Sequence, residues 1–187
     1  LEKYYAQKWR WKKFTPVSML KLTIFRVLKR KDRCAIIRYL KIHTHEAELL
    51  GFVKCLPSPK TVWHWEKVRL GVKGFREIFQ TIVKKIKELL LPFGIILAKI
   101  VCMDSTPIES TRDDKDEFAQ FNPHYKLKMY KGDIQWDGKI GVPLNYGVNS
   151  GTGYDGHKAP PMIDELRKFL KTIIETFIGD THYNTID

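Results

Sequence analysis

The pattern of apolar residues changes at Gly94, and this change constrains the fold more than any other feature of the sequence. Before Gly94, apolar residues recur every three or four positions, which is the spacing of helices with one buried face. After it, residues 95–103 form a continuous apolar, β-rich run, as buried strands do. The sequence therefore predicts an α/β chain, with a helical region at residues 1–93 and a sheet-containing region at residues 94–187.

The front region contains four stretches with a helical pattern. The apolar residues of the first two are Val17, Leu20, Ile24, Val27 and Leu28, and then, after Asp32, Ile36, Ile37, Leu40 and Ile42. Ser58 as N-cap and Pro59 at the first helical position predict a third helix that ends before Gly71. The fourth and clearest helix covers residues 75–90, because an apolar stripe lies beside lysines until Pro92 stops it.

Positive charge is concentrated in the front half of the chain. The whole chain carries a net charge of +12. Residues 1–100 hold 23 Lys and Arg against 7 Asp and Glu, a net charge of +16, whereas the remainder holds 10 against 14, a net charge of −4. A basic front and a mildly acidic back are expected when one segment binds phosphates and another gathers carboxylates around cations. The alternative is that lysine-rich helices merely have solvated faces.

The third predicted helix gives the candidates for DNA contacts. It would expose Lys60, Lys67 and Arg69, and a helix-turn-helix would direct these side chains toward a DNA groove. A helical bundle with basic faces explains the same pattern equally well. Aromatic and basic residues also alternate in residues 4–14, and this arm could stack on nucleic acid or pack on its own domain.

Cysteine usage and hydropathy exclude several classes of protein. Cys34, Cys55 and Cys102 are odd in number and widely spaced, so the sequence suggests neither a disulfide framework nor a paired-cysteine zinc site. No apolar stretch has the length of a membrane span, and the first residues do not resemble a secretory signal. We therefore expect a cytoplasmic location and no membrane partner.

The back region predicts a sheet with one helical crossover. Residues 124–130 alternate like a strand, Asp137 and Gly138 mark a turn, and residues 142–148 read as another strand. These strands should pair with residues 95–103 as an antiparallel meander. Pro160 and Pro161 open a helix with the apolar face Met162, Leu166, Phe169, Leu170 and Ile173, and a short strand at residues 174–178 follows.

Two aspartates end strand-like runs. Asp104 follows residues 95–103, and Asp180 follows residues 174–178. If these strands are parallel neighbours, as a strand-helix-strand connection favours, their carboxylates converge at one edge of the sheet. Converging carboxylates repel each other unless cations join them, and Mg²⁺ prefers such oxygen ligands. Taken alone, an aspartate at a strand end more often caps a turn than binds a metal.

Five segments together resemble the insertion-sequence DDE transposases. Residues 103–110, Met-Asp-Ser-Thr-Pro-Ile-Glu-Ser, resemble the block of the first Asp in that family, and residues 179–183, Gly-Asp-Thr-His-Tyr, resemble the block of the second. Three segments lie between them. Residues 124–128 are similar to the family's second-strand block, and residues 142–144 are similar to its third strand. Residues 151–155 are similar to its Gly-rich turn ending in Asp.

The resemblance implies a ribonuclease H-like fold, incomplete at its end, and a DNA transposase in which Asp104 and Asp180 are catalytic metal ligands for Mg²⁺ or Mn²⁺. The implied partner is double-stranded DNA, both transposon ends and target, and the implied location is the prokaryotic nucleoid. A homodimer is one assembly that it leaves open. Lys126 and Lys128, on the polar face of the second strand, would contact DNA or simply face solvent.

The sequence departs from the family pattern in two places. His182 stands where the family usually has Gly, and the family's Glu, the third metal ligand, comes well after the second Asp, whereas this chain stops at Asp187. The acidic residues at 109–117 read as an exposed loop, so we do not assign them as that ligand. Two alternatives to a transposase remain: another ribonuclease H-like nuclease, or a DNA-binding remnant of a mobile element that cuts nothing.

Overall fold

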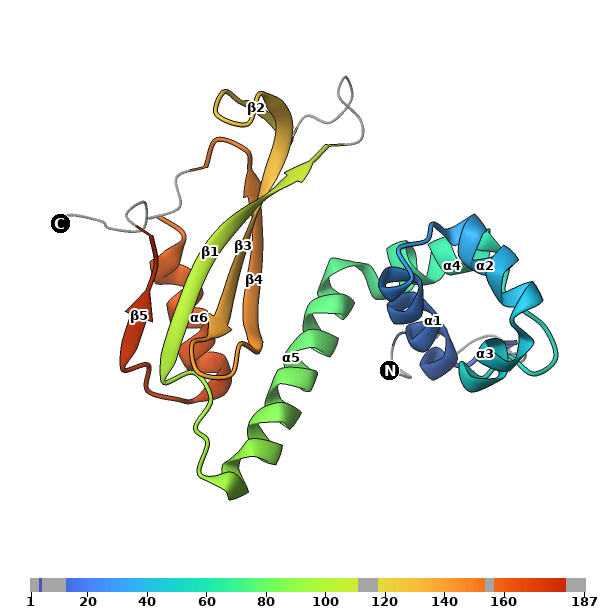
Figure 1. The fold of residues 1–187 in the computed structure, drawn as a ribbon, viewed down its shortest axis with the longest axis horizontal. Helices are drawn as coiled ribbons and strands as arrows, with labels where there is room; N and C mark the ends of the chain where they lie inside the picture. The colour runs from blue at the N-terminus through green and yellow to red at the C-terminus, as the bar shows by residue number, and fades with distance from the viewer. Residues whose placement is uncertain (1–3, 5–12, 111–117, 154–156, 181–187) are drawn as a thin grey trace. The chain divides into compact units, whose positions relative to one another are not determined.

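The computed structural model describes the chain except for residues 1–3, 5–12, 111–117, 154–156 and 181–187 (Figure 1). It consists of two compact units, Leu1–Ile78 and Phe79–Asp187, and the division falls within one long helix. Each unit contains its own cluster of buried apolar side chains.

The first unit is helical. Its elements are α1 (Pro16–Leu28), α2 (Arg33–Ile42), α3 (Thr44–Leu49), α4 (Pro59–His64), the π-helix η2 (Trp65–Leu70) and the beginning of α5 (Gly71–Leu90). Helices α1, α2 and α4 begin at the N-caps Thr15, Asp32 and Ser58, whose side chains each accept a hydrogen bond from the backbone N–H three residues later. The predicted cap at Ser58 and the Pro at the first helical position are confirmed.

The helix that begins at Pro59 is regular only through α4. It then continues as the π-helix η2, and Gly71, with φ of +57°, follows that segment. A π-helical turn changes the angular spacing of side chains, so Lys60, Lys67 and Arg69 do not share the exposed face of one regular helix. Lys60 and Lys67 are exposed, but Arg69 is half-buried, and the prediction that all three are exposed was wrong for Arg69.

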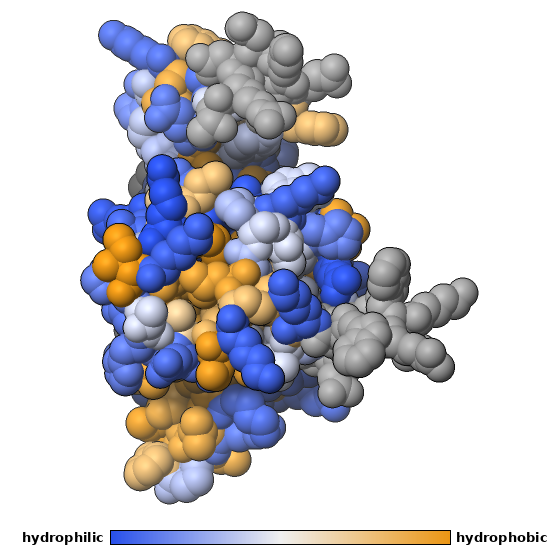
Figure 2. All heavy atoms as spheres, turned by 90° about the vertical axis from the view of Figure 1, so that its right-hand side faces the viewer, coloured by the Kyte–Doolittle hydropathy of each residue, from blue (hydrophilic) through white to orange (hydrophobic). Residues whose placement is uncertain are grey.

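The core of the first unit draws on every helix from α1 to η2. Its buried apolar members are Met19, Leu22, Ile36, Ile37, Leu40, Ala47, Leu50, Phe52, Val62, Trp65 and Leu70. The apolar stripe of α1 that stands out in the sequence lies largely outside this core, since Val17, Ile24, Val27 and Leu28 are between 46% and 74% exposed. Figure 2 shows a face on which hydrophilic side chains predominate and hydrophobic ones are exposed between them.

The second unit contains a five-stranded mixed sheet (Figure 1). Its strands are β1 (Ile100–Glu109), β2 (Gln120–Asn122), β3 (Leu127–Asp137), β4 (Pro143–Ser150) and β5 (Thr176–Ile178). β3 pairs antiparallel with β1 on one side and with β4 and the short β2 on the other, whereas β5 runs parallel to β1. The predicted meander is confirmed, as is the later strand that returns through a helix.

Helix α6 (Ala159–Leu170) connects β4 to β5 and covers one face of the sheet. Met103 of β1 packs against Met162 of that helix, and Val101 belongs to the same buried cluster as Leu166. Val83, in the C-terminal part of α5, completes this core. The predicted α/β class is therefore confirmed: a helical N-terminal region precedes a mixed sheet with a flanking helix.

The first strand differs from its prediction at both ends. It was expected at residues 95–103 but begins at Ile100, because Ala98 adopts φ of +66° in a turn and donates its N–H to Asp137 Oδ2 at 2.8 Å. Leu97 and Ala98 are fully buried without belonging to a strand, so their apolar character reflects the core. The strand also does not stop at Asp104 but continues to Glu109.

The second predicted strand also begins later than expected. Residues 124–126 form a turn in which Asn122 Oδ1 accepts hydrogen bonds from the N–H groups of His124, at 2.9 Å, and Tyr125, at 3.3 Å. Lys126 completes the turn with φ of +54°. β3 therefore starts at Leu127, and the placement of Lys126 on a strand was wrong.

Candidate functional site

Asp104 lies in the middle of β1, on the sheet face away from α6. Its neighbour Met103 is buried against α6, and successive side chains of a strand point to opposite faces. Asp104 pairs with Ile134 of β3 and is exposed. Its Oδ1 accepts a hydrogen bond from the N–H of Ser105 at 2.8 Å, and the described residues give the carboxylate no other hydrogen bond or ion pair.

Asp180 lies just beyond the end of β5, which pairs in parallel with β1. The last pair of that register joins Cys102 to Ile178, so Asp104 and Asp180 each follow the last paired residue by two positions. Asp180 is exposed, like Asp104. Neighbouring strands lie about 4.8 Å apart. The two aspartates that the sequence singles out thus occupy equivalent positions, two residues beyond the last pair of two neighbouring parallel strands.

Two carboxylates at such positions form a set of hard oxygen donors. Magnesium is usually held by one or two protein carboxylates, with water and phosphate oxygens completing its octahedron. Within the described part of the chain there is no group of three or more His, Cys, Asp and Glu side chains that could hold a metal ion. In donor type, the carboxylates of Asp104 and Asp180 match the one or two carboxylates that magnesium takes from a protein.

The two lysines predicted near this edge have different settings. Lys126 is exposed in the turn before β3. Lys128 is half-buried in β3 and lies on the same sheet face as Ile134, the partner of Asp104, since six positions separate the two residues. Six residues of a strand span about 20 Å. Lys128 therefore shares the face of Asp104 but lies far along it.

Several residues of the motifs fall outside the described residues. Among them are the end of the Gly-rich turn, Tyr154 and Asp155, and the residues after Asp180, including His182. Most of the acidic loop is also outside them, whereas Glu109 is the exposed last residue of β1. Gly151, at the start of the turn, packs so closely that an added Cβ would lie 2.5 Å from the carbonyl oxygen of Met129.

Three buried carboxylates, Asp133, Asp137 and Glu66, were not identified from the sequence. Asp137 is 2% exposed and accepts hydrogen bonds from three backbone N–H groups, those of Ala98, Lys139 and Ile140. It was recognised only as part of a turn. Glu66 is 4% exposed. It is the only acidic residue between positions 49 and 76, and this isolation can be seen in the sequence.

Glu66 forms ion pairs with two arginines from different helices. Its Oε1 lies 3.1 Å from Nε of Arg26 in α1, and its Oε2 lies 2.7 Å from Nη2 of Arg33 in α2. A single acidic residue in a basic helix indicates that its carboxylate pairs with a basic residue, but nothing in the sequence identifies which of the many basic residues that is.

The described helices include none that is long and apolar enough to span a membrane.

Comparison with known proteins gives one family match and several weak structural ones. Residues 97–187 match the family described as "Transposase DDE domain". Curated proteins gave no match. Among solved structures, the Mos1 strand transfer complex matches with a TM-score of 0.29 and 13% identity over 90% of this chain and 72% of that chain. The Mos1 transposase paired-end complex with left transposon end matches with a TM-score of 0.26 and 12% identity, over 89% and 51%.

At TM-scores this low, the structural matches carry no argument about this chain. The family match is independent of them, and it includes both strands that bear the candidate aspartates, β1 and β5. It also includes the complete meander and α6. Residues 97–187 of this chain, which include both candidate aspartates, are similar to the transposase DDE domain family.

Proposed function

We propose that this chain is part of a DNA transposase that cuts the ends of an insertion sequence and joins them to target DNA. In this proposal Asp104 and Asp180 are two of the carboxylates that bind the divalent metal ions of the reaction. The observation that carries it is the parallel register of β1 and β5, in which each aspartate follows the last paired residue by two positions.

The setting of Asp104 supports a role in binding. The residue pairs with Ile134 of β3 and lies two positions beyond the last residue of β1 that pairs with β5, and a carboxylate on a paired strand is positioned more rigidly than one on a loop. It is exposed on the face away from α6, where a DNA backbone can approach. One oxygen already accepts the N–H of Ser105, which orients the group and leaves the other oxygen for a cation.

Magnesium or manganese held by these carboxylates would supply charge stabilisation at the phosphodiester and an activated water molecule. The residues of this chain would fix the position of that charge. Exposed basic residues would hold the DNA: Lys126 in the turn before β3, and Lys60 and Lys67 in the helical unit. We include Lys128 and Arg69 as further phosphate contacts, although both are half-buried.

We further propose that residues 1–93 form the DNA-binding region and residues 94–187 the catalytic region. The net charge of +16 in residues 1–100 supports this division, because phosphate neutralisation dominates nonspecific DNA affinity. The partner would be double-stranded DNA, both transposon ends and target. A homodimer would allow two ends to be held together, and sedimentation of the protein with and without end DNA tests that assembly.

Cleavage of a labelled duplex tests the function directly. The assay compares this chain, any in-frame downstream extension of it, and the variants Asp104→Asn, Asp180→Asn and Glu109→Gln, with Mg²⁺ or Mn²⁺. Glu109 is the matched control, since it is an exposed acid on the same strand as Asp104. We expect cutting that the Asn variants lose and the Gln control keeps. Binding of DNA without cutting by any form would instead identify a DNA-binding remnant of a mobile element.

Cleavage without strand transfer would support the other alternative, a ribonuclease H-like nuclease. Paired transposon ends and a supercoiled target distinguish the two activities, because only a transposase joins the cut 3′ ends to the second DNA. The same variants apply, and the joined product must disappear with Asp104→Asn.

A further inference from the structure

In the ion-pair cluster around Glu66, each of the two arginines has a guanidinium nitrogen that takes no part in the cluster's hydrogen bonds. Arg26 donates Nε–H to Glu66 and Nη1–H to the carbonyl oxygen of Lys31, at 3.3 Å. Arg33 directs both Nε and Nη2 to Oε2 of Glu66, each at 2.7 Å. Among the residues that the structure describes, Nη2 of Arg26 and Nη1 of Arg33 have no hydrogen-bond partner. Each guanidinium is therefore held in place and still has N–H groups to offer.

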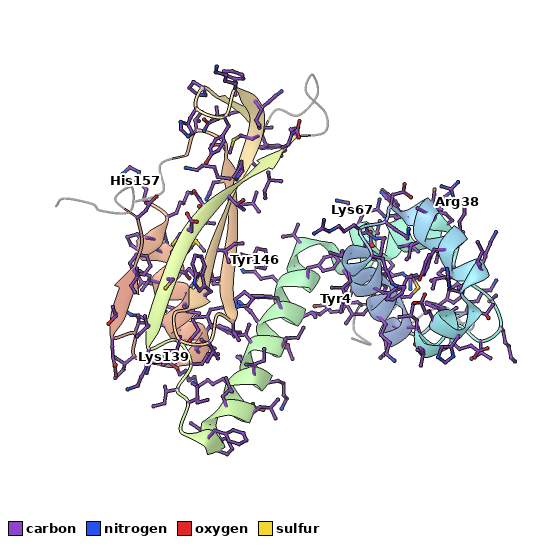
Figure 3. The ribbon with its side chains drawn as sticks, in the orientation of Figure 1. Tyr4, Arg38, Lys67, Lys139, Tyr146 and His157 are labelled. Atoms are coloured by element: carbon purple, nitrogen blue, oxygen red, sulfur yellow. The ribbon has the colours of Figure 1, made fainter. Side chains whose placement is uncertain are left out.

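The cluster lines a cavity at the surface of the helical unit. The cavity has a volume of about 250 Å³, and its charged lining consists of Arg26, Arg33, Glu66 and Lys67. Lys67, labelled in Figure 3, is exposed and has no hydrogen bond or ion pair to the described residues. Three cations and one anion give the lining a net charge of +2. The cavity thus presents a surplus of donors and of positive charge.

We propose that this cavity binds one phosphate group of a nucleic acid backbone, with Arg26, Arg33 and Lys67 as its ligands. This inference rests on the proposed DNA-binding role of the helical unit and specifies where a backbone phosphate is held. Guanidinium groups match the geometry of phosphate oxygens, and an ammonium adds a compact third charge. A phosphodiester carries a single negative charge, which the lining can neutralise.

The burial of Glu66 supports a positioning role. A buried ion pair contributes little to stability compared with apolar side chains of the same size, so stability alone does not account for it. Glu66 joins arginines of α1 and α2 to the π-helix η2, and such π-helical segments occur often at functional sites. Glu66 thereby fixes the two guanidinium groups side by side at the cavity.

Three variants with the same change in net charge test the site. Lys67→Gln removes the unpaired cation of the cavity. Lys41→Gln is the matched control, because Lys41 is also exposed and, in the described part of the chain, without an ion pair, but it lines a different pocket. The triple variant Arg26→Met, Glu66→Leu, Arg33→Met removes two positive charges and one negative charge, again a net loss of one. Replacing a buried ion-pair cluster by apolar residues is usually compatible with folding.

Fluorescence anisotropy of a labelled duplex over a range of NaCl concentrations is the measurement, with circular dichroism to confirm folding. We expect Lys67→Gln and the triple variant each to weaken binding by about tenfold and to lower the salt slope by about 1, as loss of one phosphate contact requires. Lys41→Gln should bind like wild type. If the triple variant does not fold, the comparison of Lys67→Gln with Lys41→Gln decides alone.

The two proposals fail in different ways. If both cavity variants bind DNA as Lys41→Gln does, the cavity is not a phosphate site, while the proposed DNA-binding role stands. If wild type binds no duplex at any salt concentration, the proposed role of the helical unit falls and this inference falls with it.

Discussion

Cys102 of β1 lies opposite Ile178 of β5 in a parallel register, and an aspartate follows each of them two residues later. Helix α6 leads from β4 to β5, and β5 pairs in parallel with β1. Neighbouring parallel strands have their carboxyl ends at the same edge of a sheet. Asp104 and Asp180 are therefore placed together by the topology of the sheet, and their proposed role as a pair follows from it.

Replacing either aspartate should weaken divalent metal binding. Changing residues that merely orient metal ligands typically costs about 10- to 100-fold in affinity, so loss of a ligand carboxylate should cost at least as much. Asp104→Asn and Asp180→Asn keep the size of the side chain and remove its charge. Titration with Mn²⁺, followed by electron paramagnetic resonance, measures the affinity. Wild-type affinity in Asp180→Asn, or a comparable loss in Glu109→Gln, would contradict the assignment.

Asp137 should be a major contributor to the stability of the second unit. Its carboxylate accepts the N–H groups of Ala98, Lys139 and Ile140 at 2.8 to 3.0 Å, and so fixes both the turn before β1 and the turn after β3. Asp137→Ala leaves the buried N–H of Ala98 unsatisfied, which should lower the free energy of unfolding by about 1–3 kcal/mol or more. Urea denaturation measures this change.

Asp164→Ala serves as the control for that experiment. Asp164 is exposed on α6, and within the described part of the chain its one ion-pair partner is Arg167, at 3.7 Å, so its removal should change the free energy of unfolding by less than about 0.5 kcal/mol. Equal effects of the two substitutions would show that the hydrogen bonds of Asp137 do not stabilise the fold.

The sequence predicted the elements that have a clear period or a cap. The helix at residues 75–90, the cap at Ser58 and the order of strands around α6 all follow from local pattern, and they agree with the structure. The start of β1 does not follow from local sequence pattern. Leu97 and Ala98 are apolar because they are buried, and only the distant Asp137 holds them in a turn.

The candidate site shows the same limit. Asp104 and Asp180 could be proposed because each follows an apolar run, and the family match includes both. The cluster of Arg26, Arg33 and Glu66 could not be proposed, since it joins residues 33 and 40 positions apart whose pairing depends on how three helices pack. The exposed stripe of α1 is a further case, because helical spacing shows that a helix forms but does not show which face is buried.

Asp32 should contribute to stability in a pH-dependent manner. The pKa of its carboxyl group is lowered, first of all by the hydrogen bond from the N–H of Ala35 at the start of α2. A lowered pKa in the folded state means that the charged cap stabilises the protein above the unfolded pKa, and that this stabilisation is lost as the pH falls through the folded value. Asp32→Ala should therefore lower the melting temperature at pH 7, and the difference from wild type should shrink as the pH falls below 4.

Asp32→Asn is the control for the titration. An asparagine caps helices about as well as an aspartate and carries no titrating proton, so this variant should keep most of the stability at pH 7 without the acid-dependent loss. Melting followed by circular dichroism at several pH values gives both comparisons. A constant difference between wild type and Asp32→Ala across this range would show that the charge of Asp32 does not matter.

Gly151 should tolerate no side chain. A Cβ at this position would lie 2.5 Å from the carbonyl oxygen of Met129 and 2.8 Å from that of Gln120, and both oxygens belong to strands that cannot move independently. Gly151→Ala should therefore cost about 1–3 kcal/mol of unfolding free energy, as overpacking does. At Gly147 an added Cβ would meet the flexible Met162 at an ordinary 3.4 Å, so Gly147→Ala should have little effect. Urea denaturation of both variants tests whether the close packing of β2, β3 and the turn after β4 is the reason for glycine at position 151. Equal stabilities of Gly151→Ala and Gly147→Ala would show that this packing does not exclude a side chain.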